Sequence, residues 1–409
     1  MNSTTVSPVA EVGMLSARER SDHTAFVDGG FLYVWGGHHS VAGEEVFFPS
    51  DEIWVYDMSS GVWTIYAMGG EIPPTLSQTC GCCVNGVLYI FGGCAENGHT
   101  NQLYCVDLLD GMFTWRNVTD STGTPPSPRD KHSCWVYADR LIYFGGYGCK
   151  QMREVTDSRR FITDEMSWVT IGTMLFRFWG WNNEVHVFDP RTNTWSEPQM
   201  HGIPPKPRAA HSSATLGRMG YVCGGVEAPS MNIHCLDLET WTWTEIVPTS
   251  TVPVERSWHT LTPLSDSTLF LFGGLSMSGE TLSDGWIFDV HRKEWRELQH
   301  SHRDKPRLWH SACLGQDSDV IVFGGSRDYA LLADTISVLQ SPSQSHCSDL
   351  LLFDTQPLPL LRLCEDCIGR NARTLEQQLS WLPKKIQEKL RKRILFFRTA
   401  KSQGTYNSR

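Results

Sequence analysis

The sequence lacks the features that would place the protein in a membrane, outside the cell or on nucleic acid. It has no run of eighteen apolar residues, so no membrane-spanning helix is expected. Residues 1–5 contain neither a basic cluster nor an apolar stretch, so we expect no secretion signal. The net charge is −10 and the repeated part has no Lys/Arg cluster, which argues against nucleic-acid binding because that binding depends on neutralising phosphates. These absences predict a soluble protein of the cytoplasm or nucleus.

The cysteines show no disulfide framework. There are 13 of them, an odd number scattered through the chain, as in proteins that use reduced thiols as small hydrophobic residues. Two Cys-x-x-Cys pairs, Cys80/Cys83 and Cys364/Cys367, would together suit zinc. Core packing is the favoured interpretation, because the first pair lies in a segment of strand character whose side chains alternate in direction. We therefore expect no metal and no cofactor.

What the chain does contain is a repeat. An Arg-x-x-His group precedes an apolar segment that ends in Gly-Gly, a pair that relaxes the backbone where a strand must turn. The five clear copies start at Arg20, Arg129, Arg208, Arg256 and Arg307 and lead to the pairs that begin at Gly36, Gly145, Gly224, Gly273 and Gly324. A sixth copy leads to Gly92-Gly93 and carries Ser77-Gln78-Thr79-Cys80 in place of the Arg and His.

Each Gly pair is followed by a second apolar strand that ends in Asp, and in five copies by a Trp. The Asp residues are Asp57, Asp107, Asp189, Asp237, Asp289 and Asp354, and the Trp residues are Trp63, Trp115, Trp195, Trp243 and Trp295. These signals together describe a four-stranded antiparallel unit. Six units at the kelch period resemble an all-β fold, a six-bladed kelch β-propeller, which we place within residues 1–357.

Two units depart from the pattern. The third has an insertion around residues 153–179, which we interpret either as a hairpin packed on itself or as one wall of a binding site. The sixth meets Pro357 and Pro359 before any Trp strand, and proline is poorly tolerated in a central strand. We expect residues 5–12 to supply the missing strand and close the ring.

After Pro359 the apolar spacing becomes helical. Leu360, Cys364 and Ile368 form one stripe, and Gly369 is expected to end that helix. Pro383 suits the first turn of a second helix. We therefore predict a helical segment over residues 358–400 and a disordered tail over residues 401–409.

The repeats predict binding rather than catalysis. Several His residues could converge on the propeller axis as a metal or catalytic site. Because the Arg-x-x-His group recurs at one repeat position, the favoured interpretation is that it ties each blade to its neighbour by charge-assisted hydrogen bonds. The sequence shows no Ser/His/Asp grouping, phosphate-binding glycine loop or carboxylate pair. A kelch enzyme that depends on copper or iron is the less favoured alternative.

The tail resembles two adaptor-binding motifs. Pro359 to Ile368 resembles a BC box, whose residues at Leu360, Cys364 and Ile368 would fill pockets of the elongin B/C adaptor. Residues 382–390 resemble a cullin-2 box, with its positions at Leu382, Pro383, Ile386 and Leu390. The basic residues of the last helix also allow a helix that lies on a membrane surface or binds calmodulin, or a plain solvated face.

The whole chain resembles the kelch-repeat substrate receptors of cullin-2 RING ubiquitin ligases. The segments that carry the resemblance are 129–131, 143–148, 180–182, 207–211 and 256–259. It implies a non-catalytic subunit that works with elongin B/C, cullin-2 and a RING-box protein. Its propeller would capture C-termini of client proteins, notably those ending in glycine, for ubiquitination and degradation. A kelch scaffold without a ligase role is the alternative.

The resemblance also implies a client site. In the family two arginines of blade four and a serine of blade five hold the terminal carboxylate between aromatic walls. Ser257 and Trp258 match the serine and its aromatic neighbour, and Trp181 and Tyr147 match further wall positions. The arginine positions hold Val226 and Ser230. Lys131, Arg256 or a residue of the insertion would have to supply the cation, or the specificity has changed.

Overall fold

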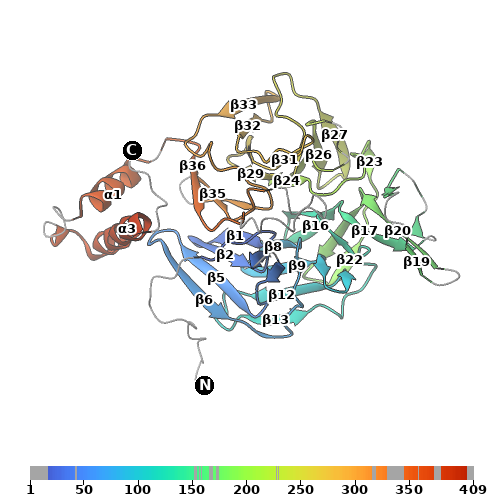
Figure 1. The fold of residues 1–409 in the computed structure, drawn as a ribbon, viewed down its shortest axis with the longest axis horizontal. Helices are drawn as coiled ribbons and strands as arrows, with labels where there is room; N and C mark the ends of the chain where they lie inside the picture. Colours follow the sequence, from blue (N-terminus) through green and yellow to red (C-terminus); the bar gives the residue numbers. More distant parts are fainter. Residues whose placement is uncertain are drawn as a thin grey trace.

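A computed structural model of the chain shows six antiparallel sheets arranged as blades around one axis, with two helices beside the ring (Figure 1). The residues that the structure describes are 17–41, 44–151, 154, 155, 157, 159–164, 169–171, 175–226, 228, 230–315, 319–328, 345–357, 359–372 and 379–402. Among the described helices, none is both long and apolar enough to cross a membrane.

Each of the first five blades runs from an inner to an outer strand as an antiparallel meander. Blade one contains β1 (Thr24–Asp28), β2 (Phe31–Trp35), β5 (Glu52–Asp57) and β6 (Val62–Ala67). Blade two contains β8 (Cys80–Val84), β9 (Val87–Phe91), β12 (Leu103–Asp107) and β13 (Thr114–Asn117). Blade three contains β15 (Ser133–Tyr137), β16 (Arg140–Phe144), β21 (Val185–Asp189) and β22 (Thr194–Ser196).

The other three blades repeat this order. Blade four contains β24 (Ser212–Leu216), β25 (Met219–Cys223), β26 (Ile233–Asp237) and β27 (Thr242–Ile246). Blade five contains β29 (Thr260–Pro263), β30 (Thr268–Phe272), β32 (Gly285–Asp289) and β33 (Glu294–Leu298). Within the described residues blade six contains three strands, β34 (Ser311–Leu314), β35 (Asp319–Phe323) and β36 (Leu350–Asp354).

The inner strands close the ring. β1, β8, β15, β24, β29 and β34 each contact the next in this order, and β34 contacts β1. The strand that we expected at residues 5–12 lies outside the described residues. Short strands extend two outer edges, because β7 (Gly69–Gly70) pairs in parallel with β13 and β23 (His201–Gly202) pairs in the same way with β27.

The repeated Asp and Trp have separate roles in a blade. Asp57 ends β5 and accepts the backbone N–H of Ser59 at 2.8 Å, which caps the turn to the outer strand. The Trp of the outer strand packs against the preceding blade, as when the ring of Trp195 lies 5.3 Å from that of Phe91. These aromatic contacts bury large apolar areas between neighbouring sheets, which is the main stabilisation that the ring gains from its repeats.

The Gly pair and the His of the next blade fit together. A Cβ on Gly92 would lie 2.6 Å from the carbonyl oxygen of Arg129 and 2.8 Å from the ring of His132. The N–H of Gly93 donates to that same carbonyl at 2.8 Å. Glycine is therefore required because the neighbouring blade approaches the backbone closely and because φ is positive at both positions.

The Arg and His of the repeat differ in the blade that their side chains reach. The ring of His211 in blade four is hydrogen-bonded to the hydroxyl of Ser133 in blade three at 2.9 Å, so the histidine ties neighbouring blades as predicted. The bond is not charge-assisted as we expected, because burial lowers the pKa of His211 well below its usual value. The guanidinium of Arg208 instead donates to the carbonyl oxygen of Gly224 in its own blade at 3.0 Å. The prediction was wrong for the arginine side chain, because the arginine spans the Gly turn of its own sheet.

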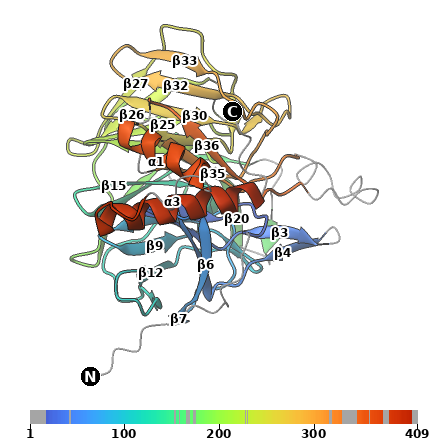
Figure 2. The same ribbon diagram turned by 90° about the vertical axis from the view of Figure 1, so that its left-hand side faces the viewer.

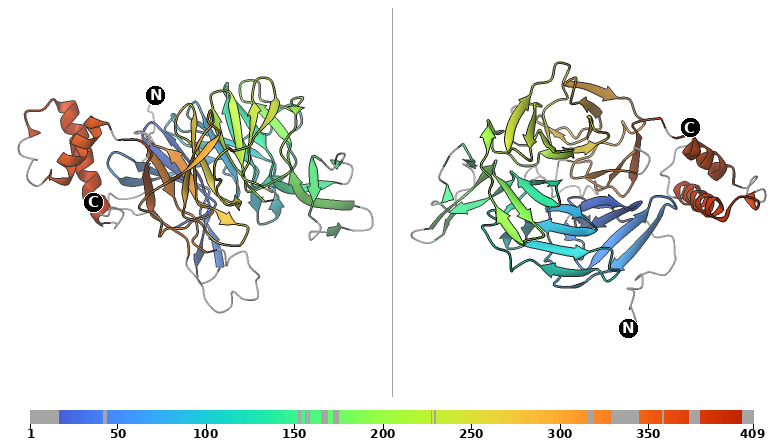
Figure 3. Two further views of the ribbon diagram at one scale, coloured as in Figure 1. Left: turned by 90° about the horizontal axis from the view of Figure 1, so that it is seen from above. Right: turned by 180° about the vertical axis from the view of Figure 1, so that it is seen from behind.

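The helical segment forms a hairpin outside the ring, beside blades one and six (Figures 2 and 3). It consists of α1 (Leu360–Arg370) and α3 (Lys384–Ser402). The side chain of Arg393 donates to Asp366 at 2.6 Å between the helices, and both residues are buried. α1 ends at Arg370, one residue after Gly369, where we predicted its end. A Cβ on Gly369 would meet Phe397 at 2.6 Å, so this glycine permits the close helix crossing. Lys401 and Ser402, which we expected in the disordered tail, belong to α3, and residues 403–409 lie outside the described part.

Candidate functional site

On one face of the ring, the segment that follows each Gly pair forms a short antiparallel ladder with the Arg-x-x-His group of its blade. Examples are the bridge between Ser21 and His38 and the pairing of β28 (Arg256–Ser257) with β31 (Leu275–Ser276). In blade two the equivalent bridge joins Ser77 to Cys94, so this copy of the group spans residues 76–79, one residue earlier than predicted. Buried Leu76 takes the place of the arginine.

The third residue of each group lies in the left-handed region of the backbone. These residues, with φ between 52° and 57°, are Asp22, Gln78, Lys131, Ala210, Trp258 and Trp309. Their backbones are joined across blades, since Ala210 N–H donates to Lys131 at 2.9 Å and Trp258 N–H donates to Ala210 at 2.9 Å. Each such conformation costs about 1–3 kcal/mol in a residue other than glycine and is typical of functional sites.

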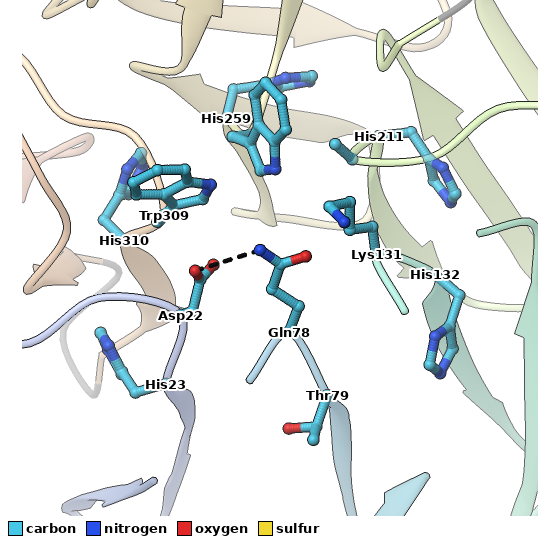
Figure 4. A pocket seen from close by; sticks show the side chains of 12 residues that line it. Asp22, His23, Gln78, Thr79, Lys131, His132, His211, His259, Trp309 and His310 are labelled. Atoms are coloured by element: carbon cyan, nitrogen blue, oxygen red, sulfur yellow. Dashed lines mark hydrogen bonds between the residues drawn. The ribbon is translucent and has the colours of Figure 1, made fainter. Parts of the chain in front are cut away.

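These six residues surround a cavity of about 200 Å³ on the axis, which we call the central pocket (Figure 4). The fourth residues of the groups lie around it as well. They are His23, Thr79, His132, His211, His259 and His310. Burial lowers the pKa of all five histidines, to about 3 for His310, so they are neutral at pH 7. In the described part of the chain no three His, Cys, Asp or Glu side chains are placed to hold a metal ion.

The charges of the central pocket are sparse. Lys131 is the one lysine or arginine among its described lining residues, and its ammonium lies 2.7 Å from the carboxylate of Asp130. Burial alone would raise the pKa of Asp130, but its hydrogen bond with His99 and the charge of Lys131 lower the pKa below its usual range. Across the pocket the carboxylate of Asp22 accepts a 3.4 Å hydrogen bond from the amide of Gln78.

The insertion of blade three forms a wall beside the pocket. β20 (Leu175–Asn182) pairs with β17 (Tyr147–Gln151), β18 (Phe161–Thr163) and β19 (Val169–Ile171), and β17 also pairs with β14 (Arg129–Asp130). The sheet projects from the ring on the side away from the helices (Figure 1).

Aromatic side chains cover this wall. The ring of Tyr147 lies 5.5 Å from that of Trp181 and 6.1 Å from that of Trp179. The Tyr147 hydroxyl donates to Asp164, and the ammonium of Lys131 lies 5.6 Å from the Tyr147 ring centre. Lys131 therefore connects the central pocket to the aromatic wall.

The residues expected at the client site lie in three places: the central pocket, the aromatic wall and the interior of blade five. Lys131 and Trp258 line the central pocket, and Tyr147 and Trp181 lie on the adjoining wall. Ser257 is buried in β28. Arg256 is buried too, and its guanidinium makes a bidentate pair with Asp284 at 2.6 and 2.8 Å. Arg256 is thus engaged within blade five and is not available to replace a missing arginine.

The sequence interpretation missed Asp22, Gln78, Trp309 and Trp179. The first three occupy the same repeat position as Lys131 and Trp258, so the fixed place between Arg and His was the signal that could have found them. Trp179 gave no such signal, because its contact with the ring of His99, 4.8 Å away, joins the insertion to another blade.

The residues of the two tail motifs lie in the helical hairpin. Leu360 is 77% exposed and Cys364 is exposed, whereas Asp366 and Gly369 on the other side of α1 are buried. Ile368 is half-buried. Cys364 and Cys367 are free thiols on α1, while Cys80 and Cys83 lie in the inner strand of blade two, so the structure does not bring the two Cys pairs together.

The second motif is less uniformly exposed. Pro383, which directly precedes α3, is exposed, and Ile386 in the first turn of α3 is 43% exposed. Leu382 is half-buried. Leu390 is 3% exposed and lies one turn before Arg393, which contacts Asp366 of α1. A partner that binds the hairpin as it stands would therefore reach Pro383 and Ile386 directly.

Known proteins are similar to this chain in sequence along most of its length. A family model described as the KLHDC2/KLHL20/DRC7 Kelch-repeats domain matches residues 22–274. Human kelch domain-containing protein 1 is 50% identical over 390 residues, which cover 94% of this chain and 92% of that protein. Bovine kelch domain-containing protein 2 is 39% identical over 389 residues, covering 92% and 91%. Human host cell factor 2 is 27% identical, covering 84% of this chain and 43% of that protein.

Proposed function

Because the chain belongs to the kelch-repeat family that includes kelch domain-containing proteins 1 and 2, we propose that it is a substrate receptor of a ubiquitin ligase. In this proposal it joins elongin B/C, cullin-2 and a RING-box protein and performs no chemistry itself. Its propeller holds the C-termini of client proteins, notably those ending in glycine, so that the ligase can ubiquitinate them. It works in the cytoplasm or nucleus.

The exposed stripe of α1 is the observation that carries the proposal. Leu360 and Cys364 lie one helical turn apart and both are exposed, while the opposite side of α1 packs on α3 through the Asp366–Arg393 contact. An amphipathic helix docks in a groove by inserting residues at this spacing. The hairpin thus supports α1 from behind and leaves the side that resembles a BC box open to elongin.

The cullin contact would lie at the start of α3. Leu382, Pro383 and Ile386 form a short apolar surface there, while Leu390 is buried. Leu390 lies one turn before Arg393, the residue that contacts Asp366 of α1, so its burial would help to fix the exposed residues relative to the elongin stripe. In this proposal Leu390 acts on cullin binding through the hairpin.

Co-purification of elongin C tests the proposal. The double variant Leu360→Ala with Cys364→Ala should lose elongin C, because truncating central apolar anchors removes most of the binding energy of such a contact. Leu109→Ala is a matched control, since Leu109 is 71% exposed in the turn after β12, outside the hairpin. Retention of elongin C by the double variant, with unchanged thermal unfolding, would contradict the proposal.

A scaffold without a ligase role is the second candidate, and one observation favours it. A small cavity between the hairpin and the ring is lined by Phe396 of α3, Arg362 of α1, Tyr56 and Ile321, so the hairpin covers the edges of blades one and six. If that cover is its whole purpose, deleting residues 358–409 should unfold the propeller and elongin C should never co-purify. A truncated propeller that still melts cooperatively favours the ligase receptor.

A further inference from the structure

The central pocket contains buried polar atoms that the protein itself does not satisfy. Within the described part of the chain, Trp258 Nε1, Trp309 Nε1 and Gln78 Oε1 have no hydrogen-bond partner, and Trp309 is 7% exposed. Other indoles without a partner, such as Trp115 and Trp243, lie in the cores between blades. The pocket atoms differ because they line a cavity, where a ligand can satisfy them.

The orientation of these groups selects an acceptor. The nitrogen-bearing edge of Trp309 is turned toward the middle of the pocket, where Gln78 and Lys131 point as well (Figure 4). The Trp258 ring meets that of Trp309 at 6.1 Å and an angle of 78°. An indole is positive at its edge and negative on its face, so a cation would need the face, whereas an edge N–H suits a carbonyl or carboxylate oxygen.

The charges favour a neutral acceptor over a carboxylate. Lys131 is already paired with Asp130, and the surrounding histidines are neutral. Asp22 adds a carboxylate to the lining, and Val226 stands where the resemblance implies an arginine. A carboxylate that enters would face Asp22 without a free cation from the described lining, and it would leave Gln78 Oε1 without a donor.

We propose that the central pocket selects peptide ends that carry a terminal carboxamide over the same ends with a carboxylate. The amide oxygen accepts from the indoles of Trp258 and Trp309, and the amide N–H groups donate to Gln78 Oε1 and to Asp22. This inference rests on the proposed function, in which clients present their C-termini to this pocket. It changes the chemistry of the recognised end and leaves the preference for a final glycine in place.

Two peptides of one sequence test the inference on the full-length chain. Both end in Gly-Gly, one as the free acid and one as the amide, and fluorescence polarisation measures their affinities. We expect the amide to bind at least about tenfold more tightly, because a site with both donors and acceptors penalises a ligand that leaves them unpaired. A third peptide ends in asparagine as the free acid, so it carries a carboxamide on its side chain and a carboxylate at its end. Its affinity shows whether the pocket accepts a side-chain carboxamide in place of a terminal one.

Single substitutions then show which side-chain atoms produce the preference for the amide peptide. Trp309→Phe removes the N–H and keeps an aromatic ring, so amide binding should weaken about tenfold. Asp22→Asn removes the repelling charge and should bring the two affinities closer together. Trp381→Phe is the control, since Trp381 is exposed at the helical hairpin, and it should change neither affinity. Trp258→Phe repeats the test if Trp309→Phe lowers the melting temperature.

The outcomes separate this inference from the ligase role. An acid peptide that binds as tightly as the amide overturns the inference. If neither peptide binds while elongin C still co-purifies through Leu360 and Cys364, the client pocket is wrong and the ligase contact stands. Amide selectivity without elongin C supports the inference and removes the ligase role.

Discussion

The central pocket and the helical hairpin are built in opposite ways, the pocket from all six blades and the hairpin from one segment of the chain. The pocket takes one residue from each of six blades, holds all six in a left-handed conformation, and surrounds them with buried histidines. The hairpin comes from one segment and exposes apolar side chains on helices that pack through the buried Asp366–Arg393 ion pair and the close crossing of Gly369 and Phe397. A pocket made by the whole ring suits a selective contact with many clients, whereas a local helical face suits one fixed partner. Four predictions test this contrast, in order of decreasing effect.

Acid should unfold the ring before the hairpin. Burial lowers the pKa of His23, His211, His259 and His310, while neither α1 nor α3 contains a histidine. Because the folded pKa lies below the unfolded value of 6.5, the unfolded state binds protons first. Stability is therefore fully present above pH 6.5 and falls as the pH drops toward 3, by up to about 1.4 kcal/mol per pH unit for each histidine.

Chemical denaturation between pH 7 and pH 5 measures this loss. His310→Gln should reduce the slope of stability against pH, and Leu109→Ala in the exposed turn after β12, which removes no titratable group, should leave it unchanged. A slope that does not respond to His310→Gln would mean that other groups control acid unfolding.

Asp366→Ala should loosen the hairpin and spare the ring. The change leaves Arg393 buried without its 2.6 Å partner, and breaking a buried ion pair in this way costs about 3–5 kcal/mol. Hydrogen exchange should therefore show faster exchange in α1 and α3 alone. Glu365→Ala on the same helix is the control. Equal loss of protection in the blades would show that ring and hairpin form one cooperative unit.

Val226→Arg should convert the pocket toward carboxylates. Val226 pairs with Ala209, next to the pocket residue Ala210, so an arginine there can reach an anionic end. A charge-assisted contact should tighten binding of a glycine-ended acid peptide about tenfold, or about 1.4 kcal/mol. Val226→Met supplies the bulk without the charge and should give no gain. The unmodified chain should bind that acid peptide more weakly than an arginine-bearing relative does.

Lys392→Gln should have the smallest effect. Its ammonium lies 3.5 Å from the carboxylate of Asp57, where α3 meets blade one. Half-exposed pairs of this kind contribute about 0–1 kcal/mol. Thermal melting in low and high salt should show that the variant loses no more unfolding free energy than this. A greater loss would mean that the hairpin depends on this ion pair for its place beside the ring.

Much of the fold was predictable because its signals are local and repeated. Strands such as β2, β9 and β25 occupy the residues expected before the Gly pairs, and the Trp of each outer strand lies where the repeat placed it. The one-residue shift in blade two was not predictable, because the missing Arg and His removed the markers that fix the register. The role of Gly369 in the helix crossing was not predictable, because its neighbour, Phe397, is distant in sequence.

The candidate site was predictable only in part. The pocket and its wall do contain Lys131, Trp258, Tyr147 and Trp181. Arg256 is instead held in an ion pair with Asp284 inside blade five. Nothing in the local sequence distinguishes an arginine that faces a client from one that spans a Gly turn. The same holds for Leu390, whose spacing matches its exposed neighbours although its side chain is buried.

The sequence by itself determined the number of blades, the order of their strands and the change to helical spacing after Pro359, since each depends on residues close together in the chain. Only the tertiary structure decided which polar atoms have partners within the protein and which face the central pocket. Those partners come from different blades, as Ser133 and His211 do, and their meeting depends on the closure of the whole ring.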